Sequence, residues 1–347
     1  MPLIGAVTVA ALFVLNLTLP EAFTDRPGGP SGPLVFVTCY LVLRSVQVLV
    51  VLTRADRPGR AALRFGLPRL AAVTLILAAA ALPGHQWRHS GWLRVGLWAL
   101  AVAVEFIAGG RIRSVGLGVV SAAHWAERYA LILLVALGES IISLGLGSES
   151  TAGRPVSWAV IVASLAGVTV IAALWWMYFD TLALALEQRL HRTRDPDTRA
   201  AFARDVYAYL HLPLIAGIIL FALGLKRYLA AIAQPHGGPW LARPAELDHR
   251  VLYAGVIVYI AGLLALGVRS SHRVPPLPTA AVVALAVGLP AAGRLPAVAG
   301  LAVLAAVCVA LVLLGRREPA REQVRRTALR EQLAAEQEQS EWRRRHL

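Results

Sequence analysis

The chain has 347 residues, of which 57% are hydrophobic and only 16% are charged. Soluble domains carry about 25% charged residues, so this composition excludes a disordered chain, a coiled coil and an ordinary soluble enzyme. The formal net charge of +14 could indicate nucleic-acid binding. The basic residues, however, lie in short stretches between apolar runs, which favours a membrane protein that binds no nucleic acid.

Ten apolar segments follow one another along the chain, each close to the roughly 20 residues that span a membrane. They cover approximately 3–19, 33–53, 67–82, 92–109, 119–146, 157–185, 204–231, 250–268, 277–292 and 296–315. The predicted fold is an all-α, polytopic transmembrane helix bundle of about ten spans over 1–315. A charged cytoplasmic tail helix follows over 316–347, either solvated or touching anionic lipid headgroups.

The Lys and Arg residues outside these segments predict the orientation of the bundle. The N-terminus, the C-terminal tail and the connections on the same side hold 23 of the 34 basic residues, and the opposite side holds 9. Because cytoplasmic connections are enriched in Lys and Arg, we expect both termini in the cytoplasm.

Ionisable residues inside the apolar segments are the most informative ones, because each costs roughly 2.5–3.5 kcal/mol to insert near the bilayer centre. They are Arg44, Glu105, His124, Glu127, Arg128, Glu139, Asp180 and His211. The two cysteines, Cys39 and Cys308, lie in apolar runs and are predicted to be small buried residues. They indicate neither a disulfide framework nor a cysteine metal site.

Segment 119–146 holds four of these ionisable residues. At 100° per residue, His124, Arg128 and Glu139 share one helix face, and Glu127 flanks it. The first group lies near the cytoplasmic end, where side chains can extend to the interface. Glu139 lies about 16 Å beyond Arg128 along the helix axis. At that depth it should either pair with a cation on another helix, Arg44 being one choice, or take up a proton.

The remaining ionisable residues lie in other segments. Asp180 lies in the cytoplasmic half of 157–185. Pro213 predicts a kink beside His211, which makes this histidine either a proton relay or a structural residue near the interface. Arg44 needs a carboxylate partner, and we expect Glu105.

No metal site, cofactor or catalytic centre is predicted. His124 and Glu127 have the i, i+3 spacing of a helical metal-ligand pair, which would need further ligands from a second helix. Arg128 beside them would repel a cation. The chain also has no Walker loop, dinucleotide fingerprint or nucleophile elbow.

Three stretches carry a resemblance to a known family. HWAERYALILLVALGESII (124–142), ALWWMYFD (173–180) and YAYLHLPLIAGII (207–219) resemble the bacterial low temperature requirement A family, as does LPEAF (19–23). The resemblance implies a multi-pass protein of the bacterial inner membrane that is linked to growth in the cold. It implies no molecular activity. Family members usually begin with two further spans, one acidic and one Trp-rich, which we expect either upstream in the same reading frame or absent from a shortened member.

Three functions remain open. The leading one is a proton-coupled secondary transporter whose partners are the lipid bilayer and a small solute or proton. The alternatives are a non-catalytic membrane component that affects cold growth or lipid order, and a membrane-embedded lipid-modifying enzyme. We expect no enzymatic activity, and the sequence does not indicate an oligomeric state. A cavity in the middle of the membrane would favour transport. A cleft open to one leaflet would favour a lipid-modifying enzyme, and the absence of a cavity would favour the non-catalytic membrane component.

The predicted orientation can be tested with topology reporters. Fusions at residues 153 and 194 should report opposite sides of the membrane, with residue 194 cytoplasmic, because one predicted span separates them. Alkaline phosphatase and a fluorescent protein provide complementary readouts, since each is active on one side only. Reporting of both positions from the same side would contradict the ten-span topology.

Overall fold

The computed structural model describes residues 2–19, 31–53, 59, 62–82, 90–111, 122–146, 157–233, 238–271 and 273–316. These residues form helices joined by short turns, and no strand occurs within the described ranges. Each of the ten expected apolar segments contains a helix. Seven helices in the described ranges are long and apolar enough to cross a membrane. The predicted all-α membrane helix bundle is thereby confirmed, whereas the charged tail expected over 316–347 lies outside the described residues except for Arg316.

The chain divides into two compact units, residues 1–118 and 119–347. Unit 1 contains α1 (Pro2–Thr18), α2 (Gly32–Leu52), the short π-helix η2 (Ala62–Gly66), α4 (Leu67–Ala81) and α5 (Ser90–Arg111). Its described core is small, and the Phe36 ring of α2 packs on Trp98 of α5 at 5.0 Å between ring centroids. Of these helices, α1 is apolar but shorter than a typical span.

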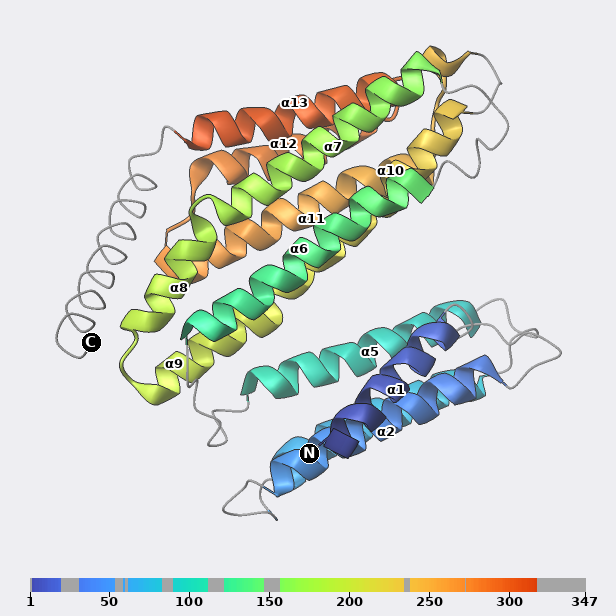
Figure 1. Ribbon diagram of the computed structural model, residues 1–347. Helices are drawn as coiled ribbons and strands as arrows, with labels where there is room; N and C mark the ends of the chain where they lie inside the picture. The colour runs from blue at the N-terminus through green and yellow to red at the C-terminus, as the bar shows by residue number, and fades with distance from the viewer. Residues whose placement is uncertain are drawn as a thin grey trace, which may run out of the picture. The chain divides into compact units, whose positions relative to one another are not determined.

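Unit 2 contains a larger hydrophobic core, built from long helices that lie alongside one another (Figure 1). Its elements are α6 (Ala122–Leu146), α7 (Trp158–Phe179), α8 (Leu182–Arg192), α9 (Pro196–Ala203), the π-helix η4 (Arg204–Tyr209), α10 (His211–Ala233), the 3₁₀ turn η5 (Pro239–Leu241), α11 (Glu246–Ser271), α12 (Pro276–Ala292) and α13 (Ala297–Gly315). The short helices α8 and α9 lie at one end of this unit, near the start of α6 and the end of α11 (Figure 1).

Two of the expected continuous segments are interrupted. Segment 157–185 breaks at Asp180 and Thr181, after which α8 buries Leu186 and Leu190 and exposes Arg189. This four-residue spacing makes α8 amphipathic. Because apolar residues continue from α7 into α8, the sequence did not indicate the break between the two helices. Segment 204–231 begins as the wider helix η4 and becomes α-helical only at His211.

Glycines bring α10 and α11 into backbone contact. A Cβ added at Gly255 would lie 2.4 Å from the Phe221 backbone nitrogen, and one at Gly217 would lie 2.7 Å from the Gly255 carbonyl oxygen. The contact continues seven residues further along each helix. There Gly224 of α10 lies against Leu252, and Gly262 of α11 lies against Leu214. Small residues at helix interfaces allow this close approach, which drives helix association in lipid.

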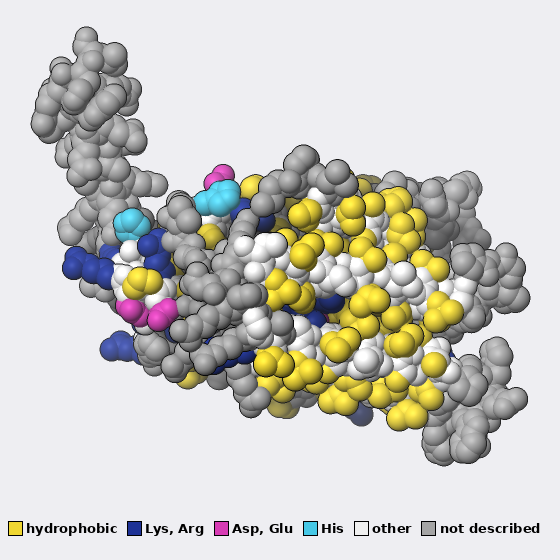
Figure 2. Space-filling model, turned by 90° about the horizontal axis from the view of Figure 1, so that it is seen from below, with side chains coloured by type: hydrophobic (Ala, Val, Ile, Leu, Met, Phe, Trp, Pro, Cys, Tyr) yellow, Lys and Arg dark blue, Asp and Glu magenta, His cyan; other side chains and the backbone are white. Residues whose placement is uncertain are grey.

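Basic residues are unequally divided between the two ends of unit 2. The end that carries α8 and α9 holds Arg189, Arg192, Arg194, Arg199, Arg204, Arg269, Arg273 and Arg316, whereas the opposite end holds Lys226, Arg227, Arg243, Arg250 and Arg294 among the described residues. Figure 2 shows that hydrophobic side chains cover much of the face seen in this view. By the positive-inside rule, the unequal division of basic residues in unit 2 favours a cytoplasmic position for the α8–α9 end, and the orientation stays a prediction.

Ion pairs and a helix cap order the α8–α9 end. Asp205 accepts from Arg204 at 2.7 Å and from Arg269 of α11 at 3.2 Å, which ties η4 to α11. Asp195 caps α9 by accepting from the hydroxyl and the backbone nitrogen of Thr198. Both hydrogen bonds lower the pKa of Asp195 because they stabilise its charged form, and the bond from the Thr198 hydroxyl has the larger effect.

The glycine contact predicts a strong asymmetry between two conservative substitutions. Gly255→Ala should destabilise the protein by about 1–3 kcal/mol, because the added methyl meets backbone atoms that cannot rotate away. Gly288→Ala is the matched control, since nothing lies within 4 Å of a Cβ there. It should be neutral, or stabilising by up to about 1 kcal/mol. Thermal unfolding in detergent would compare the two, and equal midpoints would contradict the contact.

Candidate functional site

The polar residues of α6 lie on the side of the helix that faces away from the core of unit 2. Leu133, Leu137 and Ser140 form the buried face, with exposed fractions of at most 3%. The predicted polar set lies on the opposite side, and its four members are all exposed: His124, Glu127, Arg128 and Glu139. The helical spacing therefore places these four residues together on one open face.

Glu139 is the deepest member of this polar face. It lies well inside the 25-residue helix α6, and it has no hydrogen bond or ion pair with any residue that the structure describes in unit 2. The described residues also contain no group of three or more His, Cys, Asp or Glu that could hold a metal ion. The α6 face thus combines an exposed carboxylate well inside the helix with a histidine and an arginine nearer the helix start.

His211 lies on the other side of α6, inside an aromatic cluster. Its ring is 1% exposed and stacks on Tyr207 at 5.4 Å between centroids. The rings of Tyr129 and Tyr178 surround it at 5.3 and 5.5 Å. Tyr207 of η4 precedes His211 by four residues, whereas Tyr129 and Tyr178 come from α6 and α7. The histidine is therefore a core residue of unit 2.

Both ring nitrogens of His211 are hydrogen-bonded. Nδ1 lies 2.9 Å from the carbonyl oxygen of Val206, and Nε2 lies 2.8 Å from the hydroxyl of Tyr178. A carbonyl only accepts, so in the neutral ring Nδ1 donates to Val206 and Nε2 accepts from Tyr178. The Val206 carbonyl is available because the π-helix shifts the bond from Leu210 to Asp205 at 3.0 Å. The irregular backbone before Pro213 thus creates the acceptor that orients the histidine.

A second buried histidine was missed by the sequence analysis. His249 of α11 is 3% exposed; its Nδ1 lies 2.7 Å from the Tyr228 hydroxyl and its Nε2 3.0 Å from the carbonyl oxygen of Leu289 in α12. The predicted segments 204–231 and 250–268 had left His249 in the connection between them. The apolar spacing of Leu252 and Tyr253 extends back to His249, and this signal could have moved the helix start upstream.

The two Tyr–His pairs lie at opposite ends of the α10–α11 helix pair. Tyr178 and His211 join α7 to the start of α10, whereas Tyr228 and His249 join the end of α10 to the start of α11. Between them, the Tyr259 hydroxyl donates to the carbonyl oxygen of Leu174 at 2.8 Å. Hydrogen bonds between buried polar groups therefore connect the helices of unit 2 at several levels along their length.

Unit 1 contains the remaining predicted pair. Arg44 of α2 forms an ion pair with Glu105 of α5, and its second terminal nitrogen donates to Gln47 at 2.7 Å. The partner expected for Arg44 is thus present. Its guanidinium also lies over the Tyr40 ring, 4.8 Å from the centroid. Asp180, by contrast, is half-buried in the turn that ends α7, so it lies near the end of unit 2 that carries α8.

Comparison with known proteins identifies the family. The sequence profile described as "Bacterial low temperature requirement A protein (LtrA)" matches residues 2–313. The chain belongs to the LtrA family. The matched range covers α1 to α13, so the polar face of α6 and both Tyr–His pairs lie in the LtrA region of the chain.

A curated relative is similar over part of the chain. An uncharacterized protein of Rhizobium meliloti (strain 1021) is 30% identical over 250 residues. The match covers 66% of this chain and 56% of that protein, so the similarity spans little more than half of the relative's length. No solved structure shows a significant match. Membership in the LtrA family and the apolar helices together indicate a multi-pass membrane protein.

The two tyrosines beside His211 should respond differently to loss of their hydroxyl groups. The Tyr178 hydroxyl donates to His211, whereas the Tyr207 hydroxyl is buried without a hydrogen-bond partner among the described residues. Tyr178→Phe should cost about 1–3 kcal/mol, because it leaves a buried ring nitrogen unsatisfied. Tyr207→Phe should be neutral or stabilising. Equilibrium unfolding in detergent would measure both, and a larger loss for Tyr207→Phe would contradict the assignment.

Proposed function

We propose that this LtrA protein is a proton-linked secondary transporter of a small solute in the bacterial inner membrane. The carrying observation is Glu139, an exposed carboxylate well inside the 25-residue helix α6, which has no hydrogen bond or ion pair with any described residue of unit 2. Ionisable residues at this depth are costly and typically serve ion or proton pathways. His124 and Arg128 continue the same face towards the helix start.

The buried histidines have a different role in this proposal. Both nitrogens of His211 and both nitrogens of His249 are engaged by a tyrosine and a backbone carbonyl. A group with all its hydrogen-bonding positions filled is suited to holding helices together. For the interior of unit 2, this observation favours a structural role. Such a role agrees with the second candidate function, a non-catalytic membrane component. Proton transfer is therefore assigned to the α6 face alone.

A lipid-modifying enzyme receives less support. Unit 2 contains a cavity near the end that carries α8, bounded by α7, α8, α11, α12 and α13, which we call the end cavity. Among the described residues of its lining there is no His, Asp, Glu or Cys. Hydrolysis or group transfer would need a general acid or base beside the reacting bond, so we propose that the protein has no enzymatic activity.

The experiment uses the full chain in liposomes that contain a pH-sensitive dye. Amino acids, carboxylates, sugars and polyamines are added outside in turn, and solute-dependent change of internal pH is recorded. At least one class should drive proton movement with the wild type. Glu139→Gln should abolish this movement, because glutamine preserves the shape but carries no titratable proton. Movement that is unchanged by Glu139→Gln between pH 5.5 and 8 would contradict the coupling role.

Glu246→Gln is the matched control. Glu246 is an exposed carboxylate at the start of α11, and it pairs with Arg250 one turn along the helix. Exposed pairs of this kind contribute about 0.2–1 kcal/mol, so the control should fold and transport like the wild type. Absence of proton movement with every solute class would contradict transport itself and favour the non-catalytic alternative.

A further inference from the structure

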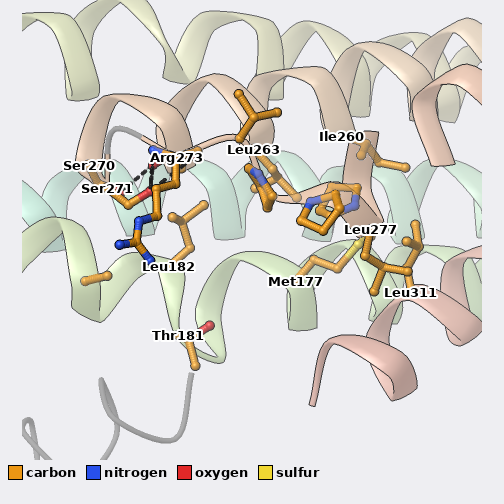
Figure 3. Close-up of a pocket in the computed structure, with 16 residues that line it drawn as sticks. Met177, Thr181, Leu182, Ile260, Leu263, Ser270, Ser271, Arg273, Leu277 and Leu311 are labelled. Carbon is orange, nitrogen blue, oxygen red and sulfur yellow. Dashed lines mark hydrogen bonds between the residues drawn. The ribbon is translucent and has the colours of Figure 1, made fainter. Parts of the chain in front are cut away.

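The end cavity has an apolar part and a polar part. Its volume is about 810 Å³, within the range of about 300–1,000 Å³ typical of ligand sites. Figure 3 shows Met177, Leu277 and Leu311 gathered at one end, and Ser270, Ser271 and Arg273 at the other. A molecule that fills this cavity would therefore have an apolar body and a polar head.

A second, smaller cavity continues the polar part. It has a volume of about 440 Å³ and shares Ala185, Ser270 and Ser271 with the end cavity. The remaining lining comes from the polar side of α8 and the residue after it: Gln188, Arg189, Arg192 and Thr193. The two cavities thus form one continuous site that begins among apolar helices and ends between arginines.

The polar part is rich in hydrogen-bond donors. Three arginines line the two cavities, and no Asp or Glu is among the described residues of either lining. The Nε2 atom of Gln188 is buried and has no hydrogen-bond partner among the described residues. A buried donor without a partner is costly. An anionic group with several acceptor oxygens would be attracted by the three arginines that line the polar part, which carry positive charge whatever else they contact.

From this arrangement we infer that the site binds one anionic phospholipid of the surrounding membrane. An acyl chain occupies the end cavity, and the phosphate lies among Arg273, Arg189 and Arg192. The site lies at the arginine-rich end of unit 2, which the charge distribution assigns to the cytoplasmic side. Basic pockets between transmembrane helices on that side are suited to anionic headgroups. This inference does not depend on solute transport.

Native mass spectrometry of the full chain in detergent tests the inference. Phosphatidylglycerol and phosphatidylcholine with identical acyl chains are added separately, and the retained lipid is counted. The wild type should retain one phosphatidylglycerol per chain at a concentration at least about tenfold below that needed for phosphatidylcholine. The triple variant Arg189→Gln, Arg192→Gln, Arg273→Gln should lose this preference. Equal retention of both lipids by the wild type would overturn the inference.

Two controls separate a built site from general attraction to positive charge. The triple variant Arg227→Gln, Arg243→Gln, Arg250→Gln removes equal charge from the opposite end of unit 2 and should keep the preference. If it loses the preference equally, the inference is overturned. Ala185→Trp places a bulky side chain where the cavities meet, and should reduce retention about tenfold without removing charge. Unchanged retention in Ala185→Trp would overturn it too.

Folding and headgroup recognition are checked in the same preparation. Unfolding temperatures without added lipid identify any variant that fails to fold, in which case the remaining variant decides. Glycerol phosphate, a headgroup analogue without acyl chains, should not displace the bound lipid at equal concentration. Displacement by this soluble anion would overturn the assignment of the apolar part to an acyl chain.

Discussion

The close approach of α10 and α11 determines much of unit 2. In a bilayer, lipid tails are as apolar as leucine, so helices gain little from burying apolar surface against each other. Dispersion contacts and hydrogen bonds must hold them together. Gly217 and Gly255 allow the two backbones to meet directly, which fixes both the relative depth and the rotation of the helices. The positions of Tyr228, His249 and Tyr259 follow from that register.

The buried hydrogen bonds then fix the outer helices around this pair. Tyr259 donates to a carbonyl of α7, and Tyr253 donates to the Gly300 carbonyl of α13 at 2.7 Å. His249 reaches Leu289 of α12. Each bond satisfies a polar group that would otherwise be stranded in an apolar interior. The polar residues of the core therefore set which helices are neighbours, while the glycines set how close two of them come.

The helices were predictable from local pattern, but their pairings were not. Runs of apolar residues located all ten segments because membrane depth imposes their length. The break at Asp180 was hidden, since leucines continue on both sides of it. The Arg44–Glu105 pair could be expected because few carboxylates lie within spans. Tyr178 and His211 are 33 residues apart, and no local signal indicates that a tyrosine of one helix meets a histidine of another.

The polar face of α6 separates the two leading functions. A component that served only to hold helices together would be expected to engage its ionisable residues, as His211 and Arg44 are engaged. Glu139 is exposed on a helix whose opposite face is fully committed to the core. In the predicted topology Glu139 lies at membrane depth, where a carboxylate without a partner in unit 2 costs free energy, and its exposed side chain contributes nothing to the packing of unit 2. Proton exchange would account for this cost, because a carboxylate that takes up and releases a proton cannot be paired permanently with another residue.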